Sequence, residues 1–306
     1  MPSKVEIIFK GILEGHKDAV YALCQGRDPG QFFSAGGDGM IVRWNLAHNL
    51  DGVVVARMPS AIYSMIYFKE TDIMMAGTRF GNLFALDLQT QKHLAVKNLE
   101  NDIFSLCYIP HLNMIMAACA NGYLYVLHPQ TLGIIHEFHR SESSCRCLAL
   151  SPDGKHLASG WSDGKIRIYD VNTDFFEIQE YEAHLPSVFS LVYSLRGNQL
   201  ISGGRDAQIR VWDAENAYLE THKIPAHLFT VNDLEMMPEL GLMASASRDK
   251  TVKIWDAVDF DLLKVIDNTK LPAHSHSVNK LLWTDFENIL VSAGDDKSIL
   301  LWGIIC

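Results

Sequence analysis

The sequence predicts an all-β fold, a seven-bladed β-propeller of four-stranded blades, and three observations predict it. An alternating apolar segment recurs seven times, and its aromatic or leucine residue falls at Trp44, Leu86, Leu127, Tyr169, Trp212, Trp255 and Trp302. The spacing of about 41 to 47 residues is typical of four-stranded blades. Tight-turn pairs such as Asp38-Gly39 and Asp163-Gly164 separate the apolar runs. An unassigned run, Val5–Ile12, precedes the first repeat, while the last repeat stops after its third strand.

Each blade is expected to contain an inner strand, a second strand, a tight hairpin, a third strand and an outer strand. The recurring aromatic or leucine residues mark the third strands. The inner strands are expected to begin at Val20, Ile62, Ile103, Cys145, Val188, Val231 and Val278. We expect Val5–Ile12 to be the outer strand of blade 7, so that residues 1–306 form one propeller domain. Such closure removes two sheet edges that would otherwise be open to aggregation.

Four side chains recur at constant spacing in four of the repeats. The sets are His16, Ser34, Asp38 and Trp44; His184, Ser202, Asp206 and Trp212; His227, Ser245, Asp249 and Trp255; and His274, Ser292, Asp296 and Trp302. Together with the pairs Trp212-Asp213 and Trp255-Asp256, they resemble the WD-repeat (tryptophan-aspartate repeat) β-propeller family over essentially the whole chain. The resemblance implies that each set forms a buried hydrogen-bonded tetrad. The chemistry is consistent with this, because a buried indole N–H needs an acceptor and a serine hydroxyl can both accept and donate.

Repeats 2 to 4 depart from this pattern. Repeat 4 keeps Ser159 and Asp163 but has Tyr169 for the tryptophan and Ser141 for the histidine, whereas Met58 and Leu99 replace the histidine in repeats 2 and 3. We expect apolar packing to hold this region, with its methionines as adaptable core residues; a methionine-rich adhesive surface is the alternative. Trp161 and Trp283 lie outside the tetrads and are interpreted as packing residues.

Composition restricts the function. The 306 residues include 48% hydrophobic residues and carry a formal net charge of −10, which argues against direct, sequence-independent binding of nucleic acid. The start Met1–Glu6 has no secretory pattern and no stretch is apolar enough to span a membrane, so a cytoplasmic location is expected. The six cysteines include no CxxC pair. Buried thiols are favoured over the alternative of a zinc site at Cys145 and Cys147, and no metal or cofactor is expected.

Serine, histidine and aspartate together are also the residues of a catalytic triad. Here they occur four times, each with a tryptophan, whereas a nucleophile is needed only once. The sequence therefore favours a noncatalytic protein-interaction scaffold. Two alternatives stay open: an enzyme with a site in the central channel, and a subunit of a nucleic-acid-processing complex that does not touch nucleic acid.

A binding surface is expected on the top face, where the inner strands begin and the tight hairpins turn. In the WD-repeat family, residues beside the start of the inner strand and before the hairpin aspartate point to this face. The partner-binding residues expected by this resemblance are Tyr21, Tyr63, Arg79, Asp102, Phe104, Arg146, Phe189, Arg205, Asn232, Arg248, Asn279 and Asp295. Aromatic residues and arginine dominate interface hot spots, and arginine suits carboxylate or phosphate. We therefore expect four aromatics to form an apolar floor beside four arginines, with an acidic or phosphorylated peptide as the ligand; a merely solvated rim is the alternative.

Overall fold

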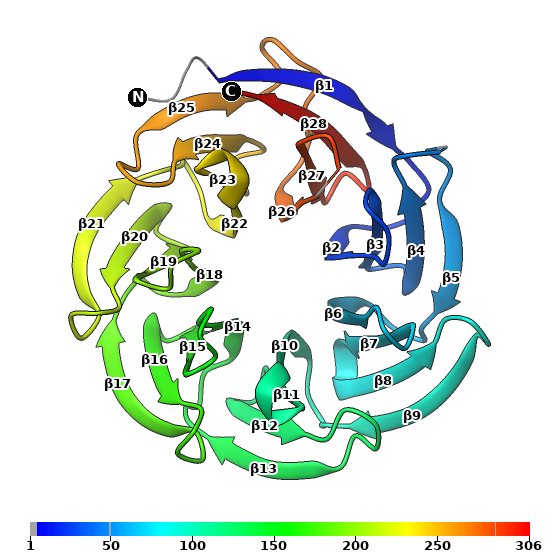
Figure 1. The fold of residues 1–306 in the computed structure, drawn as a ribbon, viewed down its shortest axis with the longest axis vertical. Helices are drawn as coiled ribbons and strands as arrows, with labels where there is room; N and C mark the ends of the chain where they lie inside the picture. Colours follow the sequence, from blue (N-terminus) through cyan, green and yellow to red (C-terminus); the bar gives the residue numbers. More distant parts are fainter. Residues whose placement is uncertain (1–4, 49, 285) are drawn as a thin grey trace.

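The chain forms a closed ring of seven antiparallel four-stranded sheets around a central axis (Figure 1). A computed structural model describes residues 5–48, 50–284 and 286–306. Residues 1–4, part of the start that was expected to have no secretory pattern, lie outside the described residues. The predicted seven-bladed all-β fold is confirmed.

The strands follow the predicted order within each blade. The inner strands are β2 (Val20–Gln25), β6 (Ile62–Phe68), β10 (Ile103–Ile109), β14 (Cys145–Leu150), β18 (Val188–Tyr193), β22 (Val231–Met237) and β26 (Val278–Trp283). The second strands are β3 (Gln31–Gly36), β7 (Ile73–Thr78), β11 (Met114–Cys119), β15 (His156–Trp161), β19 (Gln199–Gly204), β23 (Leu242–Ser247) and β27 (Ile289–Gly294). The third strands are β4 (Met40–Asn45), β8 (Asn82–Asp87), β12 (Tyr123–Leu127), β16 (Lys165–Asp170), β20 (Gln208–Asp213), β24 (Val252–Asp256) and β28 (Ile299–Ile305). The outer strands of blades 1 to 6 are β5 (Val53–Arg57), β9 (Lys92–Asn98), β13 (Ile134–His139), β17 (Phe176–Glu182), β21 (Leu219–Pro225) and β25 (Leu262–Ile266).

Short 3-10 turns interrupt three of the connections. They are η1 (Arg79–Gly81), η2 (Pro110–Leu112) and η3 (Pro238–Leu240). Every inner strand begins at the residue predicted for it, and every third strand carries its predicted marker residue. The repeated pattern of apolar residues therefore placed the inner and third strands.

The ring is closed by the N-terminal strand β1 (Glu6–Leu13), which is the outer strand of blade 7. It pairs antiparallel with β28 from Glu6 opposite Ile305 to Leu13 opposite Ile299, and Figure 1 shows the two strands side by side at the edge of the ring. The observed strand is shifted by one residue from the predicted run Val5–Ile12. Pairing satisfies the backbone groups of β28 that would otherwise form an open sheet edge.

The apolar core lies between neighbouring blades. Seven clusters of buried side chains each join two adjacent sheets, as where Phe33 of blade 1 packs with Met65 and Met74 of blade 2. The side chains of Met74, Met75 and Met116 are buried, which favours the core interpretation over an adhesive methionine surface. Cys145 and Cys147 are both buried and belong to different clusters on either side of blade 4.

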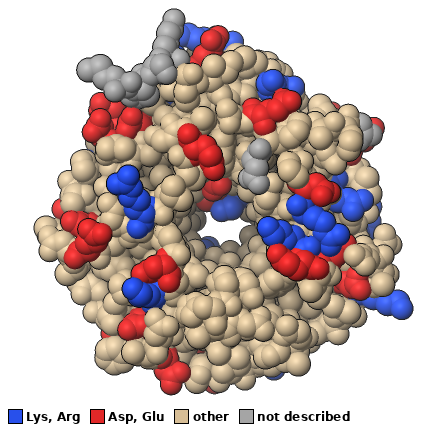
Figure 2. Space-filling model, viewed as in Figure 1, with Lys and Arg blue, Asp and Glu red and all other residues tan. Residues whose placement is uncertain are grey.

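One face of the ring shows acidic and basic side chains interleaved around an open channel (Figure 2). The structure contains no membrane-spanning helix among the residues it describes.

Candidate functional site

Each of the four predicted tetrads is a hydrogen-bonded set inside its blade. The His Nε2–Ser Oγ distances are 2.7 Å for His16–Ser34, 2.8 Å for His184–Ser202, 2.7 Å for His227–Ser245 and 2.8 Å for His274–Ser292. The same serine oxygens lie 2.8, 3.0, 2.8 and 2.9 Å from Nε1 of Trp44, Trp212, Trp255 and Trp302. The His Nδ1–Asp distances are 3.0 Å for Asp38, 2.8 Å for Asp206, 2.9 Å for Asp249 and 3.0 Å for Asp296.

The direction of these hydrogen bonds follows from which groups have protons. Indole N–H only donates, so the serine oxygen accepts from tryptophan and donates its own proton to Nε2 of the histidine. Nδ1 then carries the imidazole proton and donates it to the aspartate. In blade 6, burial lowers the pKa of His227, and although burial opposes it, hydrogen bonds from His227 and Thr251 lower the pKa of Asp249. The pair is therefore a neutral imidazole and a carboxylate at neutral pH.

Blade 4 contains a different brace, which the sequence interpretation missed. Trp161 is buried and donates from Nε1 to Ser159 Oγ at 2.6 Å, so the interpretation of Trp161 as packing alone was incomplete. Ser141 donates to Asp163 at 2.9 Å, in place of the missing histidine. The guanidinium of Arg167 covers the Trp161 ring at 4.9 Å and also contacts Asp163 at 3.1 Å.

The reason for the different brace in blade 4 lies in the residue two positions after the blade serine. The tetrad blades have a small residue there, namely Gly36, Gly204, Ser247 and Gly294. In blade 5 a Cβ at Gly204 would collide with the His184 imidazole, so the histidine leaves no room there for a large side chain. Replacement of the histidine by Ser141 frees this volume, and the Trp161 indole fills it.

Seven side chains converge at the top mouth of the channel. Every inner strand has an irregular register between its first and third residues, which turns the second residue out of the regular ladder. These second residues line a hollow of about 290 Å³ and are Tyr21, Tyr63, Phe104, Arg146, Phe189, Asn232 and Asn279. All seven are among the predicted partner-binding residues.

Aromatic rings and one guanidinium form the larger part of this floor. The ring centroids of Tyr21 and Tyr63 are 5.4 Å apart, and those of Tyr63 and Phe104 are 5.5 Å apart. Arg146 lies over Phe104 at 4.3 Å and over Phe189 at 5.7 Å, and its Nε donates to Ser162 Oγ at 2.8 Å. Arg146 is thus part of the floor rather than a free charge beside it. Burial raises the pKa of Tyr21 and Tyr63, so both phenols are neutral.

Two asparagines complete the floor by joining neighbouring blades. Asn232 donates to Ser277 Oγ at 2.9 Å and to the Val278 carbonyl at 2.8 Å. Asn279 donates to the Val20 carbonyl at 3.2 Å and to Asp295 at 2.7 Å. The floor is therefore held by contacts across the blades.

The rim of the hollow is formed by the tight hairpins. In all seven blades the hairpin residue donates its N–H to the carbonyl of the residue before the inner strand, as from Arg205 to Ser187 at 2.9 Å and from Arg248 to Thr230 at 3.0 Å. Arg79, Arg205 and Arg248 are exposed, and no ion pair joins them to any other described residue. Asp102, in contrast, accepts from the Phe80 N–H at 3.0 Å, so it also braces the blade 2 hairpin.

Comparison with known proteins agrees with this architecture. The family model described as "WD domain, G-beta repeat" matches residues 8–45, 219–256 and 267–303, and each of these segments contains tetrad residues. A second model, described as "Vps42 beta-propeller", matches residues 88–223, so that between them the models match most of the chain. The chain is a WD-repeat propeller.

Individual relatives are distant from this WD-repeat propeller. It is 24% identical over 163 residues to Cilia- and flagella-associated protein 52 of Chlamydomonas reinhardtii, a match that covers 52% of this chain and 26% of the relative. It is 24% identical over 200 residues to human Striatin-3, covering 61% of this chain and 25% of the relative. Cilia- and flagella-associated protein 251 of Tetrahymena thermophila is 30% identical over 109 residues, covering 32% of this chain and 11% of the relative. The matched region spans about a quarter of the length of the first two relatives and 11% of the length of the third.

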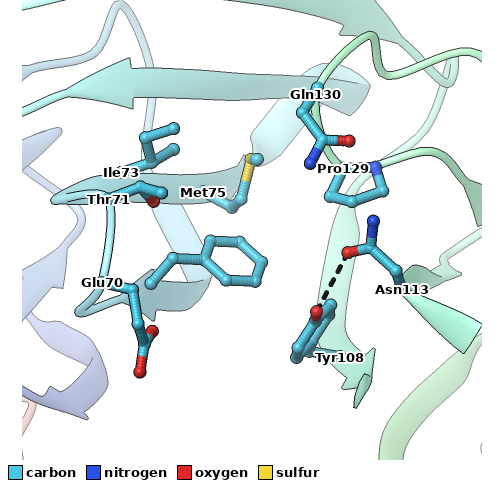
Figure 3. A pocket seen from close by; sticks show the side chains of 9 residues that line it. Glu70, Thr71, Ile73, Met75, Tyr108, Asn113, Pro129 and Gln130 are labelled. Atoms are coloured by element: carbon cyan, nitrogen blue, oxygen red, sulfur yellow. Dashed lines mark hydrogen bonds between the residues drawn. The ribbon is translucent and has the colours of Figure 1, made fainter. Parts of the chain in front are cut away.

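The WD-repeat propeller has another pocket on its bottom face, where the first and second strands of each blade are joined. It has a volume of about 380 Å³ and lies between blades 2 and 3 (Figure 3). Tyr108 lines it and donates its hydroxyl proton to Asn113 at 3.0 Å, while Met75 and Pro129 supply apolar surface. No repeated motif marks these positions, so the sequence interpretation did not find this pocket.

Trp283, the other tryptophan outside the tetrads, also forms a hydrogen bond. Trp283 donates from Nε1 to Glu239 at 3.0 Å, so like Trp161 it does more than pack. Among the described residues, the structure has no group of three or more His, Cys, Asp or Glu side chains placed to hold a metal ion.

Proposed function

We propose that this WD-repeat propeller is a noncatalytic protein-interaction module that binds acidic or phosphorylated segments of partner proteins on its top face. The observation that carries the proposal is the top-face hollow. Aromatic side chains line its floor, and the hairpins around it carry Arg79, Arg205 and Arg248 with their guanidinium groups exposed and free of ion pairs to other described residues.

The chemistry of this rim suits an anionic ligand. A guanidinium donates two parallel hydrogen bonds to a carboxylate or phosphate, and it is always charged at neutral pH. A protein with a formal net charge of −10 does not need three top-face arginines without ion pairs to other described residues for solubility. The aromatic floor offers a rigid apolar surface that loses little conformational entropy when a ligand covers it.

The tetrads support the noncatalytic part of the proposal. Their four serine side chains are fully buried, and each serine oxygen already accepts from tryptophan while its proton is donated to histidine. A nucleophilic serine must reach a substrate, which this arrangement does not allow. The repeated Ser, His and Asp residues therefore act as a structural brace.

A binding experiment with defined peptide libraries tests the proposal. The probes are a degenerate peptide library with one fixed phosphoserine, the same library with glutamate, and the same library with serine. We expect the immobilised propeller to retain the phosphoserine and glutamate libraries more strongly than the serine library, with retention falling as salt rises. The triple variant R79E/R205E/R248E should lose this retention without a change in melting temperature.

The matched control reverses three exposed charges away from the top face. K92E/R196E/K223E alters Lys92 of β9, Arg196 in the turn between β18 and β19, and Lys223 of β21, and it changes the net charge by the same amount. It should retain the acidic libraries as the wild type does. Equal loss in both triple variants, or undiminished retention by the top-face variant, would count against this surface.

A further inference from the structure

Two leucines on the top face are almost fully exposed at the same position of neighbouring repeats. Leu185 and Leu228 directly follow the tetrad histidines of blades 5 and 6, and their relative exposures are 77% and 83%. Phe229, the next residue in blade 6, is 58% exposed. Single exposed apolar residues are common on protein surfaces, but a group of large ones on adjacent loops indicates an interaction site.

The other repeats show that the fold does not require leucine there. In all four tetrad blades the residue after the histidine donates its backbone N–H to the tetrad aspartate. The distances are 2.8 Å for Lys17, 3.4 Å for Leu185, 3.0 Å for Leu228 and 2.8 Å for Ser275. Blades 1 and 7 make this bond with an exposed lysine and an exposed serine. The backbone therefore does the structural work, and the side chain is free to vary.

The leucine loops flank the arginine hairpins of the same two blades. The backbone N–H of Arg205 donates to the Ser187 carbonyl, in the loop that holds Leu185. In the same hairpin, the Ala207 carbonyl accepts from the N–H of His227 at 3.1 Å, directly before Leu228. Arg248 donates its N–H to Thr230 at the end of the Leu228 loop. The loops that hold the leucines and the hairpins that hold the arginines are therefore direct neighbours on the top face of blades 5 and 6.

We infer that blades 5 and 6 form an apolar anchor for a partner segment in which an acidic or phosphorylated residue is flanked by large apolar side chains. The anchor consists of Leu185, Leu228 and Phe229. The inference rests on the proposed function, because Arg205 and Arg248 supply the charge complementarity. A segment held in this way buries its apolar residues on the anchor while its anion pairs with the arginines. Hydrophilic acidic segments lack the first contribution and bind more weakly.

The test compares four phosphopeptide-type libraries in a two-by-two design. The central residue is phosphoserine or serine, and the three degenerate positions on each side are drawn either from Leu, Ile, Phe, Met and Val or from Ser, Thr, Asn and Gln. The wild type should bind the apolar phosphoserine library at least about tenfold more tightly than the polar one, which corresponds to about 1.4 kcal/mol. In L185S/L228S this preference should fall to about twofold or less, while binding of the polar phosphoserine library stays unchanged.

Serine is the residue that blade 7 has at this position, so the double variant keeps the backbone bond to the aspartate. The control L195S/L219S removes two leucines that are also more than half exposed but lie away from the top face, and it should keep the preference. Equal binding of the apolar and polar phosphoserine libraries by the wild type would overturn the anchor and leave the proposed function standing. Binding of neither phosphoserine library would overturn both, and equal binding of the apolar serine library would show that the arginines take no part.

Discussion

Replacement of Ser245 by alanine in blade 6 should be strongly destabilising. The hydroxyl is fully buried, accepts from Trp255 Nε1 at 2.8 Å and donates to His227 Nε2 at 2.7 Å. Alanine leaves both ring nitrogens without a partner in a site that water does not reach. Since each unsatisfied buried group costs about 1–3 kcal/mol, we expect a loss of about 2–5 kcal/mol in the free energy of unfolding.

The assay is urea-induced unfolding followed by far-UV circular dichroism, with Ser245→Ala compared with the exposed control Ser275→Ala, whose cost should be less than about 0.5 kcal/mol. A double-mutant cycle with Trp255→Phe isolates the hydrogen bond. The double variant should be at least about 1 kcal/mol more stable than the sum of the single effects predicts, because the donor and its acceptor are then removed together. A cost near that of the control, or additive single effects, would refute the tetrad as a coupled brace.

Four further predictions concern the fold and its ionisable groups. Because the folded-state pKa of the tetrad His227 lies below its unfolded value, its stabilisation is present at neutral pH and is lost as pH falls below about 6.5, so the melting temperature measured from pH 8 to pH 4 should decline over that range. The contribution of Asp249, whose pKa is also lowered, is lost only as pH falls below about 3.8. Glu235 has the opposite effect on the pH dependence of stability, because burial raises its pKa to about 7. Its contribution to stability therefore falls as pH rises from about 4.5 to about 7. The variant Glu235→Gln should be up to about 3 kcal/mol more stable than the wild type at pH 8 and equal to it at pH 4, as urea unfolding at the two pH values would show. Ser141→His should destabilise blade 4, whereas Ser141→His with Trp161→Gly should recover part of the loss, as thermal unfolding would reveal. Deletion of β1 leaves β28 unpaired and should give insoluble or unfolded protein; a soluble deletion variant with a cooperative melt would contradict closure by this strand.

The repeated features of this propeller could be predicted from the sequence because each repeat tests the others. His227, Ser245 and Trp255 have the same spacing as the corresponding residues in three further blades, and a constant spacing in four copies fixes one geometry. The inner strands were placed for the same reason. Their register is set by the alternation of side chains along each strand, which turns successive residues toward the blades on either side.

Features that depend on one blade or on contacts between blades were harder to predict. Trp161 and Ser141 are 20 positions apart, and only the shared volume of the imidazole and the indole explains why they change together. A signal existed, since all four tetrad blades have glycine or serine two residues after the blade serine, whereas blade 4, which lacks the histidine, has Trp161 there. Arg146 gave no such signal, because its stacking on Phe104 and Phe189 depends on how closely blades 3, 4 and 5 approach at the channel mouth.

Hydrogen–deuterium exchange of the propeller with and without the retained phosphoserine peptides tests the top-face binding surface. Binding there should slow exchange of the top-face segments that contain Tyr21, Arg79, Arg205 and Arg248, while the bottom-face turn between β6 and β7 is unchanged. Protection confined to that bottom-face turn and the pocket beside it, with the arginine hairpins unaffected, would contradict the top face as the binding surface.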